Sequence, residues 1–280
     1  MTQCGLRVCL GNSLIQHGHF NNRIYVIKLD PDDIPDIIRF ADDLSHKEGY
    51  SKIFARVPES SVELFSGAGY KTEAMVPFFF RGKDAAVFMA KYPDPGRKEV
   101  PHAPALADII SAAFGYAGKR SPHEQLPEGF SMMQAHTGDA KEIAALYRSV
   151  FKTHPYPGFD PDYIRESMQG QVQYFIIRQS HRLAAVASCE VDSENRNVEM
   201  TDFATGRLFR GHGFAGILLH AMETEMKNEG ILLAHTIARA IFRPINAVFA
   251  GAGYHFGGLL PNDINICGSL ESMNVWYKKV

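Results

Sequence analysis

The residues best suited to chemistry form a short glycine-rich run, Arg210-Gly211-His212-Gly213-Phe214-Ala215, at the start of a predicted amphipathic helix over 211–228. A helix N-terminus leaves several backbone N–H groups without partners, and together with the helix dipole they attract anions. Gly211 and Gly213 would let a diphosphate approach the backbone closely, and Arg207 and Arg210 add positive charge. The same run without a ligand is an ordinary glycine-rich turn, so its spacing alone leaves both interpretations open.

Other phosphate-binding classes are not expected. The pattern G-x-x-x-x-G-K-[ST] is absent, which excludes a P-loop NTPase. A dinucleotide-binding fold has little support in the sequence. The formal net charge of −2 argues against a protein that binds nucleic-acid backbones, yet it is compatible with a local basic pocket for a small anionic cofactor.

Strands and helices alternate along the chain, which predicts an α/β fold. The glycine run is expected between a strand over 197–204 and the 211–228 helix, whose apolar residues repeat at i, i+3 and i+4. A strand over 232–238 and a helix over 244–250 follow. Other strands are predicted over 24–29, 52–57, 75–80, 85–90, 174–178, 183–190 and 274–278, and other helices over 105–117, 139–151 and 160–168, after Asp30 and after Pro58. Residues 1–20 show only weak periodicity.

The glycine run resembles the signature of the GNAT acyltransferase family, Arg/Gln-x-x-Gly-x-Gly/Ala between a strand and a long helix, through Arg210, Gly213 and Ala215. The ending Phe249-Ala250-Gly251-Ala252-Gly253-Tyr254 resembles the family's second signature. The resemblance covers about 150 residues and implies a mixed twisted sheet flanked by helices, with the loop amides on the CoA pyrophosphate of acetyl-CoA. The residues that it assigns to the cofactor are Thr205, Arg210, Gly211, His212, Gly213, Phe214, Ala215 and Asn246.

The first third of the chain echoes the last. Ile53-Phe54-Ala55-Arg56 through Phe65-Ser66-Gly67-Ala68-Gly69-Tyr70 parallels 236–254 with one residue of gap. Asp30-Pro31-Asp32-Asp33 stands in place of the glycine loop, and its carboxylates would repel a pyrophosphate. We therefore expect a degenerate GNAT-like domain over 1–92, a linker with a helix over 93–129 that holds six of the fifteen prolines, and a catalytic domain over 130–280.

Acyl transfer to an amine requires a base, acting directly or through water, because the amine must be neutral when it attacks. Three carboxylates are candidates: Asp202, which is slightly preferred because it lies nearest the loop, Glu199 and Glu190. Strand alternation places Glu199 and Asp202 on opposite faces, so at most one faces the substrate unless a bulge intervenes. Each carboxylate could equally be a surface group or bind a substrate ammonium.

The family often uses a tyrosine in its last helix as the acid, and here that position is Phe249, which cannot donate a proton. The thiolate then leaves unaided or with help from His235 or Tyr174. Arg239 could bind a substrate carboxylate through a bidentate fork, with His235 also near the substrate. A CoA phosphate contact or a surface ion pair is the alternative for Arg239.

Four segments resemble the β-lysine N-acetyltransferase family more specifically, and they span nearly the whole chain. They are Asn21–Tyr25, Glu199–Thr205, Thr236–Ala240 and Glu271–Lys278. The resemblance implies transfer of acetyl to the terminal amine of L-β-lysine, which gives N6-acetyl-β-lysine, a compatible solute made under osmotic stress. Carboxylates would hold the second ammonium and Arg239 the carboxylate. The alternatives are a GNAT enzyme for another amine and a non-catalytic CoA-binding regulatory module.

The four cysteines, Cys4, Cys9, Cys189 and Cys267, form no Cys-x-x-Cys pair and match no zinc pattern. Free thiols in a reducing cytosol are the simplest interpretation, and we expect no metal. No apolar run reaches the roughly 18 residues that span a bilayer, and the N-terminus is a poor signal peptide. The expectation is a cytoplasmic enzyme with a small-molecule partner, no nucleic acid and no membrane. The sequence leaves a homodimer open.

Overall fold

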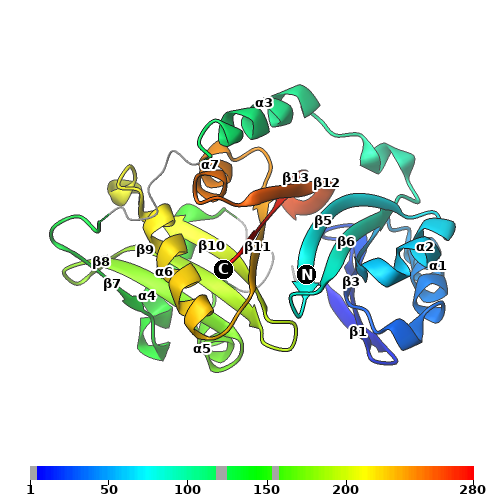
Figure 1. The fold of residues 1–280 in the computed structure, drawn as a ribbon, viewed down its shortest axis with the longest axis horizontal. Helices are drawn as coiled ribbons and strands as arrows, with labels where there is room; N and C mark the ends of the chain where they lie inside the picture. The colour runs from blue at the N-terminus through cyan, green and yellow to red at the C-terminus, as the bar shows by residue number, and fades with distance from the viewer. Residues whose placement is uncertain (1–4, 118–124, 153–157) are drawn as a thin grey trace.

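One sheet of 13 strands runs through the part of the chain that the computed structural model describes, residues 5–117, 125–152 and 158–280. Its strand order is β1-β2-β3-β4-β6-β5-β12-β13-β11-β10-β9-β8-β7. Figure 1 shows that the N-terminal and C-terminal halves lie side by side, each with its own helices. The predicted α/β class is confirmed.

From residue 5 onward, where its description begins, the N-terminal half has six strands and two α-helices. The strands are β1 (Leu6–Leu10), β2 (Ser13–Gly18), β3 (Arg23–Lys28), β4 (Lys52–Pro58), β5 (Lys71–Phe80) and β6 (Asp84–Lys91), and the helices are α1 (Asp36–Glu48) and α2 (Val62–Gly67). The connecting segment carries α3 (Ala103–Phe114), which packs on the C-terminal half through contacts of Phe114 with Trp276 and Phe256.

In the described residues 130–152 and 158–280, the C-terminal half has seven strands and four α-helices. The strands are β7 (Phe130–Gln134), β8 (Val172–Gln179), β9 (Arg182–Asp192), β10 (Asn197–Thr205), β11 (Leu233–Arg239), β12 (His255–Ile266) and β13 (Ser269–Lys279). The helices are α4 (Ala140–Val150), α5 (Pro161–Gln169), α6 (Phe214–Asn228) and α7 (Arg243–Gly251). Two separate apolar clusters lie on the two faces of this half: α6 packs in one of them and α4 and α5 in the other.

The two halves share one strand order, since β2-β3-β4-β6-β5 repeats as β9-β10-β11-β13-β12. In each half a helix, α1 or α6, connects two parallel strands, and a shorter helix, α2 or α7, follows the second of them. The halves join where β5 meets β12 in antiparallel fashion, at Ala74 and Gly258. Gly258 has φ +145°, and a Cβ there would collide with the carbonyl oxygen of Glu73, so the joint requires glycine.

The expected elements are all found, with ends that differ by a few residues, but four strands had not been predicted: β1, β2, β7 and β12. β12 was hidden by Gly257, Gly258 and Pro261, which usually mark turns. The strand accommodates them because its register with β13 shifts twice, between Phe256 and Gly258 and between Leu260 and Ile264. The expected helix over 211–228 begins at Phe214.

Residues of β4 alternate between two cores. Ile53, Ala55 and Val57 pack with α1 and α2. Phe54 on the opposite face packs with residues of both halves, including Phe79, Phe88, Leu233 and Val275. The helix-free face of the N-terminal sheet therefore lies against the C-terminal half, and Lys52 and Arg56 share that face with Phe54 because side chains alternate along a strand.

A buried charged network also connects the halves. Asp263 on β12 forms ion pairs with Arg23 and with Lys52, the latter at 3.1 Å, and Lys52 also contacts Glu73 at 3.0 Å. Burial alone would raise the pKa of Asp263, but the two cations hold it below its usual value. Removing one member of such a network leaves an uncompensated buried charge, so the network fixes how the halves are joined.

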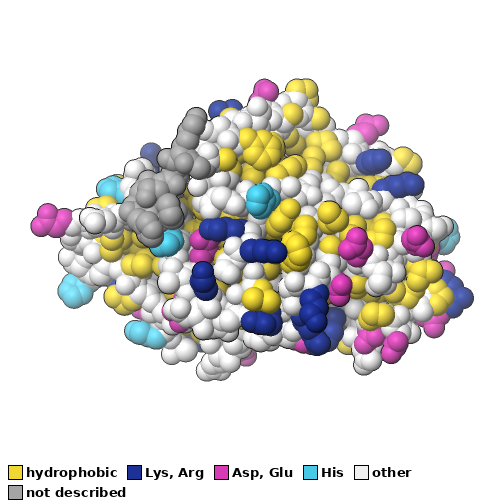
Figure 2. Space-filling model, viewed as in Figure 1, with side chains coloured by type: hydrophobic (Ala, Val, Ile, Leu, Met, Phe, Trp, Pro, Cys, Tyr) yellow, Lys and Arg dark blue, Asp and Glu magenta, His cyan; other side chains and the backbone are white. Residues whose placement is uncertain are grey.

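No helix within the described ranges is both long enough and apolar enough to cross a bilayer. In Figure 2, Lys and Arg side chains gather near the middle of the visible face, where the two halves meet.

Candidate active site

The glycine run forms an open turn at the start of α6. Gly211 and Gly213 have positive φ values of 87° and 73°, and Gly213 is the N-cap residue of the helix. No backbone acceptor within the described residues takes the amides of Gly211 to Ala215, and a Cβ on Gly211 would meet nothing within 4 Å. These features fit an anion at the helix N-terminus.

The flanking side chains stiffen this turn. The Nδ1–H of His212 donates to the carbonyl of Phe209 at 3.1 Å, and its ring stacks on Phe214 with centroids 5.2 Å apart. Phe214 is buried, whereas Arg210 and His212 are exposed. Phe214 therefore anchors the helix start, and only its backbone remains for a cofactor.

The same run also fits the dinucleotide pattern G-x-G-x-x-G through Gly211, Gly213 and Gly216, although little support for a dinucleotide-binding fold was expected from the sequence. The expectation against a dinucleotide-binding fold nevertheless holds. That fold has a mainly parallel sheet, whereas in the described sheet only β3 with β4 and β10 with β11 pair in parallel.

β10 and β11 separate before they reach the loop. Their parallel pairing covers only Asn197–Glu199 with Leu233–His235. Beyond it β10 stays paired with β9, and Thr205 lies opposite Ala185. Figure 1 shows the two strands diverging. A ligand held at the start of α6 can therefore reach unpaired backbone groups on β10.

A β-bulge places all three candidate carboxylates on one face. Glu199 lies opposite Glu190 across β10 and β9, and Ser188, two residues from Glu190, shares its face. The register shifts between Thr201 and Ala204, and Asp202 adopts φ +55°. Its carboxylate thereby accepts a hydrogen bond from Ser188 Oγ at 3.3 Å. Because of this bulge, the usual alternation of side chains along a strand is broken, and Glu199 and Asp202 lie on the same face of the sheet.

Glu199 has a strongly perturbed pKa. Its surroundings raise its pKa to about 8, chiefly through loss of solvation and then through repulsion from Glu190, while Arg56 opposes the shift. Its side chain keeps 28% of its exposure, so a ligand can still reach it. A carboxyl group that titrates near neutral pH can exchange a proton with an amine.

His235 on β11 lies beside Glu199 on β10, with its Nε2 3.7 Å from Glu199 Oε2. Burial, together with the nearby charge of Arg56, lowers the pKa of His235 to about 3, so its ring is neutral. Phe79 of the N-terminal half packs edge-on against this ring, with centroids 5.0 Å apart. His235 is thus a buried neighbour of Glu199.

Two sequence candidates have other partners. Arg239 forms a bidentate pair with Glu271 at 2.6 and 2.8 Å on a partly exposed surface. Asn246 is fully buried and donates to the carbonyls of Arg239 and Phe242, while its Oδ1 accepts from Asn274 and Trp276. Its amide is fully used in holding α7, so the structure places Asn246 in the core rather than at a cofactor surface.

The position of the family's usual acid is held by Phe249, and Tyr174 is an alternative donor. Phe249 is buried against Phe203 and Tyr254. Burial raises the pKa of Tyr174, whose hydroxyl lies 2.9 Å from Ser167 Oγ. Tyr174 therefore remains protonated on the face that carries Asp202.

The sequence left open whether the N-terminal half completes the substrate site or packs as a structural lobe, and it identified no residue of that half at the site. Arg56 and Tyr25 lie close enough to influence Glu199 or to be influenced by it, and Phe79 contacts His235. The strand alternation over 52–57 could have indicated that Arg56 lies on the face away from α1. Nothing in the sequence showed that this face meets β10 and β11.

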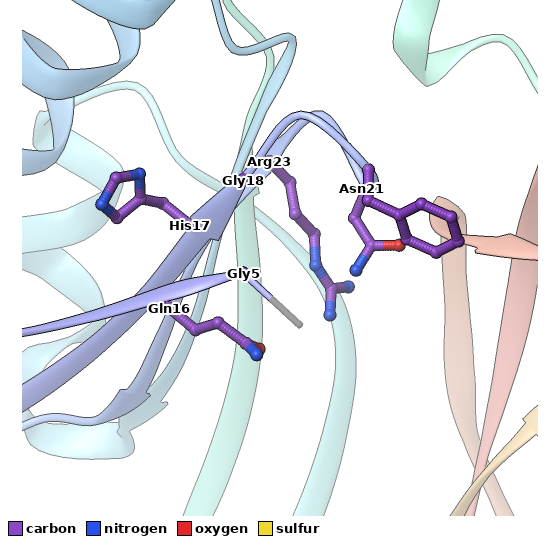
Figure 3. A pocket seen from close by; sticks show the side chains of 7 residues that line it. Gly5, Gln16, His17, Gly18, Asn21 and Arg23 are labelled. Atoms are coloured by element: carbon purple, nitrogen blue, oxygen red, sulfur yellow. The ribbon is translucent and has the colours of Figure 1, made fainter. Parts of the chain in front are cut away.

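A shallow hollow lies elsewhere, along β2 and the β2–β3 turn. Figure 3 shows Gln16, His17, Asn21 and Arg23 around it. It is distant in the fold from the α6 loop, and Arg23 there is engaged by Asp263. No group of three His, Cys, Asp or Glu side chains among the described residues could hold a metal ion.

An anion loop at a point where two parallel strands part, with ionisable groups on the first strand, is the organisation of acetyltransferases of the GNAT fold. Residues 141–243 match the family model described as the acetyltransferase (GNAT) family. The chain is 36% identical over 269 residues to a β-lysine N(6)-acetyltransferase of Methanococcus maripaludis. The alignment covers 96% of this chain and 97% of that protein.

Two further relatives agree. The N-acetyltransferase YodP of Bacillus subtilis is 32% identical, over 96% of each chain. A β-lysine N(6)-acetyltransferase of Methanosarcina mazei is 31% identical, over 84% of this chain and 93% of that protein. The chain belongs to the family that these relatives form within the GNAT acetyltransferases, and it is an acetyl-CoA-dependent N-acetyltransferase. Both resemblances noted in the sequence are confirmed.

Proposed function

We propose that this enzyme transfers acetyl from acetyl-CoA to the N6 amine of L-β-lysine, giving N6-acetyl-β-lysine, a compatible solute of the cytoplasm under osmotic stress. The observation that carries the reaction class is the open amide loop at the start of α6 beside the parting of β10 and β11. The substrate rests on the relatives, two of which are β-lysine N(6)-acetyltransferases.

The amide groups of Gly211 to Ala215, with Arg210, would hold the diphosphate of acetyl-CoA, which supplies the activated acetyl group. Glu199 accepts the proton that the substrate ammonium must lose before it attacks. Its pKa of about 8 suits exchange with an amine near neutral pH. We place Glu199 ahead of Asp202 in this role, because Asp202 is bonded to Ser188.

Glu190 and Asp202 share the face of Glu199 and would hold the second ammonium of β-lysine. Phe249 cannot donate a proton, so the thiolate leaves unaided or with Tyr174, which stays protonated on the same face. The product has lost one positive charge and is a neutral zwitterion, which can accumulate without a counterion.

The proposed domains are a degenerate GNAT-like half over 1–92, a linker over 93–129 and a catalytic half over 130–280. The repeated strand order supports the first and last of these. The position of Asp33 supports the proposal that the N-terminal half binds no cofactor. Its carboxylate lies just before α1 and accepts from the amides of Asn12 and Ser13, so a negative charge already lies near that turn.

The test is release of free CoA when purified protein is mixed with acetyl-CoA and β-lysine. We expect turnover with β-lysine above that with other amines. Turnover confined to a different amine would replace the substrate. Tight binding of acetyl-CoA without turnover of any amine would favour the non-catalytic module, which the phenylalanine at position 249 makes the second candidate.

A further inference from the structure

Arg56 is an unusual cation at the junction of the halves. It lies on the face of β4 that points away from α1 and α2, since Ala55 and Val57 pack with those helices. Its guanidinium carbon lies 4.8 Å from the centre of the Phe79 ring, and Nη2 donates to the carbonyl of Ile27 at 3.1 Å. Within the described ranges no carboxylate lies within 4.0 Å of it.

This guanidinium is aimed at the candidate active site. Phe79, on which it stacks, packs against His235, and His235 lies 3.7 Å from Glu199. Arg56 is the cation that opposes the raised pKa of Glu199. It adds to the effect of burial in lowering the pKa of His235, and it partly opposes the rise that burial causes in the pKa of Tyr25. A positive group on β4 and three carboxylates on β9 and β10 thus face one another across the junction.

Nearby cations already have anionic or carbonyl partners. Arg23 and Lys52 are bound by Asp263. Arg97 donates to the backbone of Asn21, Asn22 and Asn262. Arg239, the sequence candidate for a substrate carboxylate, is occupied by Glu271. An arginine has five N–H donors in a planar fork that matches a carboxylate, and most of those of Arg56 remain for a ligand.

We propose that Arg56, supplied by the N-terminal half, binds the carboxylate of the amino-acid substrate and makes the enzyme select amino acids over simple diamines. The amine to be acetylated then lies at Glu199 and the carboxylate at Arg56, at opposite ends of one chain. The N-terminal half thereby becomes a specificity element. This inference rests on the proposed transfer to a small amine but not on β-lysine being that amine.

The experiment compares amines that differ only in the carboxylate. β-Lysine is paired with pentane-1,4-diamine, lysine with pentane-1,5-diamine and ornithine with butane-1,4-diamine. Steady-state kinetics are measured for the wild type, Arg56→Gln and Arg56→Lys. Arg39→Gln is the matched control, because it removes an exposed guanidinium that pairs with Asp36 on the surface of the same half. Thermal unfolding and the KM for acetyl-CoA check that each variant is folded.

We expect Arg56→Gln to raise the KM for β-lysine about 10- to 100-fold, the range for hydrogen bonds to a charged group. Because loss of Arg56 also raises the pKa of Glu199, we expect any change in kcat at one pH to be shared by both members of a pair, but the rise in KM to be confined to the amino acid. Arg56→Lys should recover part of that rise. Equal rises in KM for both members of a pair, or no rise for the amino acid, would overturn the inference.

The two proposals fail in different ways. A wild type that acetylates lysine or ornithine but not β-lysine ends the substrate proposal, and Arg56 is then judged on the pair that is turned over. A wild type that prefers the diamine of every pair overturns the inference while acetyl transfer stands. Turnover of no amine at all overturns both.

Discussion

The two halves share a strand order but differ where the helix begins between their parallel strands. At α6 the turn has Gly211 and Gly213, open amides and no acidic residue in the first helical turn. At α1 the Asp33 carboxylate accepts from Asn12 and Ser13, so the chain supplies its own anion. The same strand order therefore carries an open amide turn in one half and, in the other, an acidic turn whose carboxylate is bonded to the β1–β2 turn.

The same contrast holds on the paired strands. Glu199 lies opposite His235 in the C-terminal half, whereas Arg23 lies opposite Lys52 in the N-terminal half. The first pair has shifted pKa values and access for a ligand. The second pair is buried, and its two cations are bound by Asp263 together with Glu73. One pair suits proton transfer and the other joins the halves.

The largest expected effect breaks the first pair. Glu199→Gln should lower kcat/KM about 10²- to 10⁴-fold, the usual contribution of a general base. In the wild type, kcat/KM should rise with pH through about 8, because Glu199 must lose its proton before it can accept another. A pH–rate series measures both. The variant should retain only the rise that comes from the amine itself, and an unchanged profile would remove Glu199 from the role of base.

The next effect breaks the second pair. Asp263→Asn should lower the free energy of unfolding by about 3–5 kcal/mol, because Arg23 and Lys52 lose their shared carboxylate. The folded pKa of Asp263 is depressed, so its stabilisation is present above the unfolded value of about 3.9 and is lost as pH falls through the folded value. Urea unfolding from pH 7 to pH 3 should therefore show a flatter acid limb in the variant.

The control for that experiment is Asp36→Asn, which removes an exposed pair with Arg39. It should cost about 0–1 kcal/mol. Equal losses in the two variants would show that the network at the junction contributes no more than a surface pair.

A smaller effect compares the two helix starts. Arg210→Gln should weaken acetyl-CoA binding about tenfold at low salt, and less at high salt, because Arg210 is exposed and its charge is screened. Arg39→Gln, at the start of α1, should leave acetyl-CoA binding unchanged. Calorimetric titration at two salt concentrations measures both, and equal changes in the two variants would contradict the assignment of the cofactor to α6.

The smallest effect concerns Arg239, which the internal repeat aligns with Arg56. Arg239→Gln should cost no more than about 1 kcal/mol of stability and leave the KM for the amine within twofold, since its guanidinium is held by Glu271 at the surface. A KM for the amine raised as far as in Arg56→Gln would return Arg239 to the substrate site.

The sequence allowed prediction of the parts whose signal is local. The glycine turn at 210–215, the helix behind it and the internal repeat are all encoded in contiguous residues. β12 was not predicted, because it contains residues that usually mark turns and that two bulges accommodate within the strand. The shared face of Glu199 and Asp202 depends on another bulge, which alternation alone cannot locate.

The contacts of Arg56 and Asn246 depend on chain segments distant in sequence. Arg56 meets the site only because β5 joins β12 and turns the N-terminal sheet toward β10 and β11. Asn246 looked like a cofactor ligand by its place in a family motif, yet Asn274 and Trp276 on β13 take its carbonyl oxygen. Such long-range pairings carry no mark in a single sequence.

The most direct test is a calorimetric titration of the full chain with acetyl-CoA, for the wild type and for Gly213→Val. Position 213 has φ +73°, which a β-branched residue adopts only with strain. We expect one binding site per chain in the wild type, and we expect Gly213→Val to lose that site while it remains folded. No binding by the wild type, two sites per chain, or undiminished binding by Gly213→Val would contradict it.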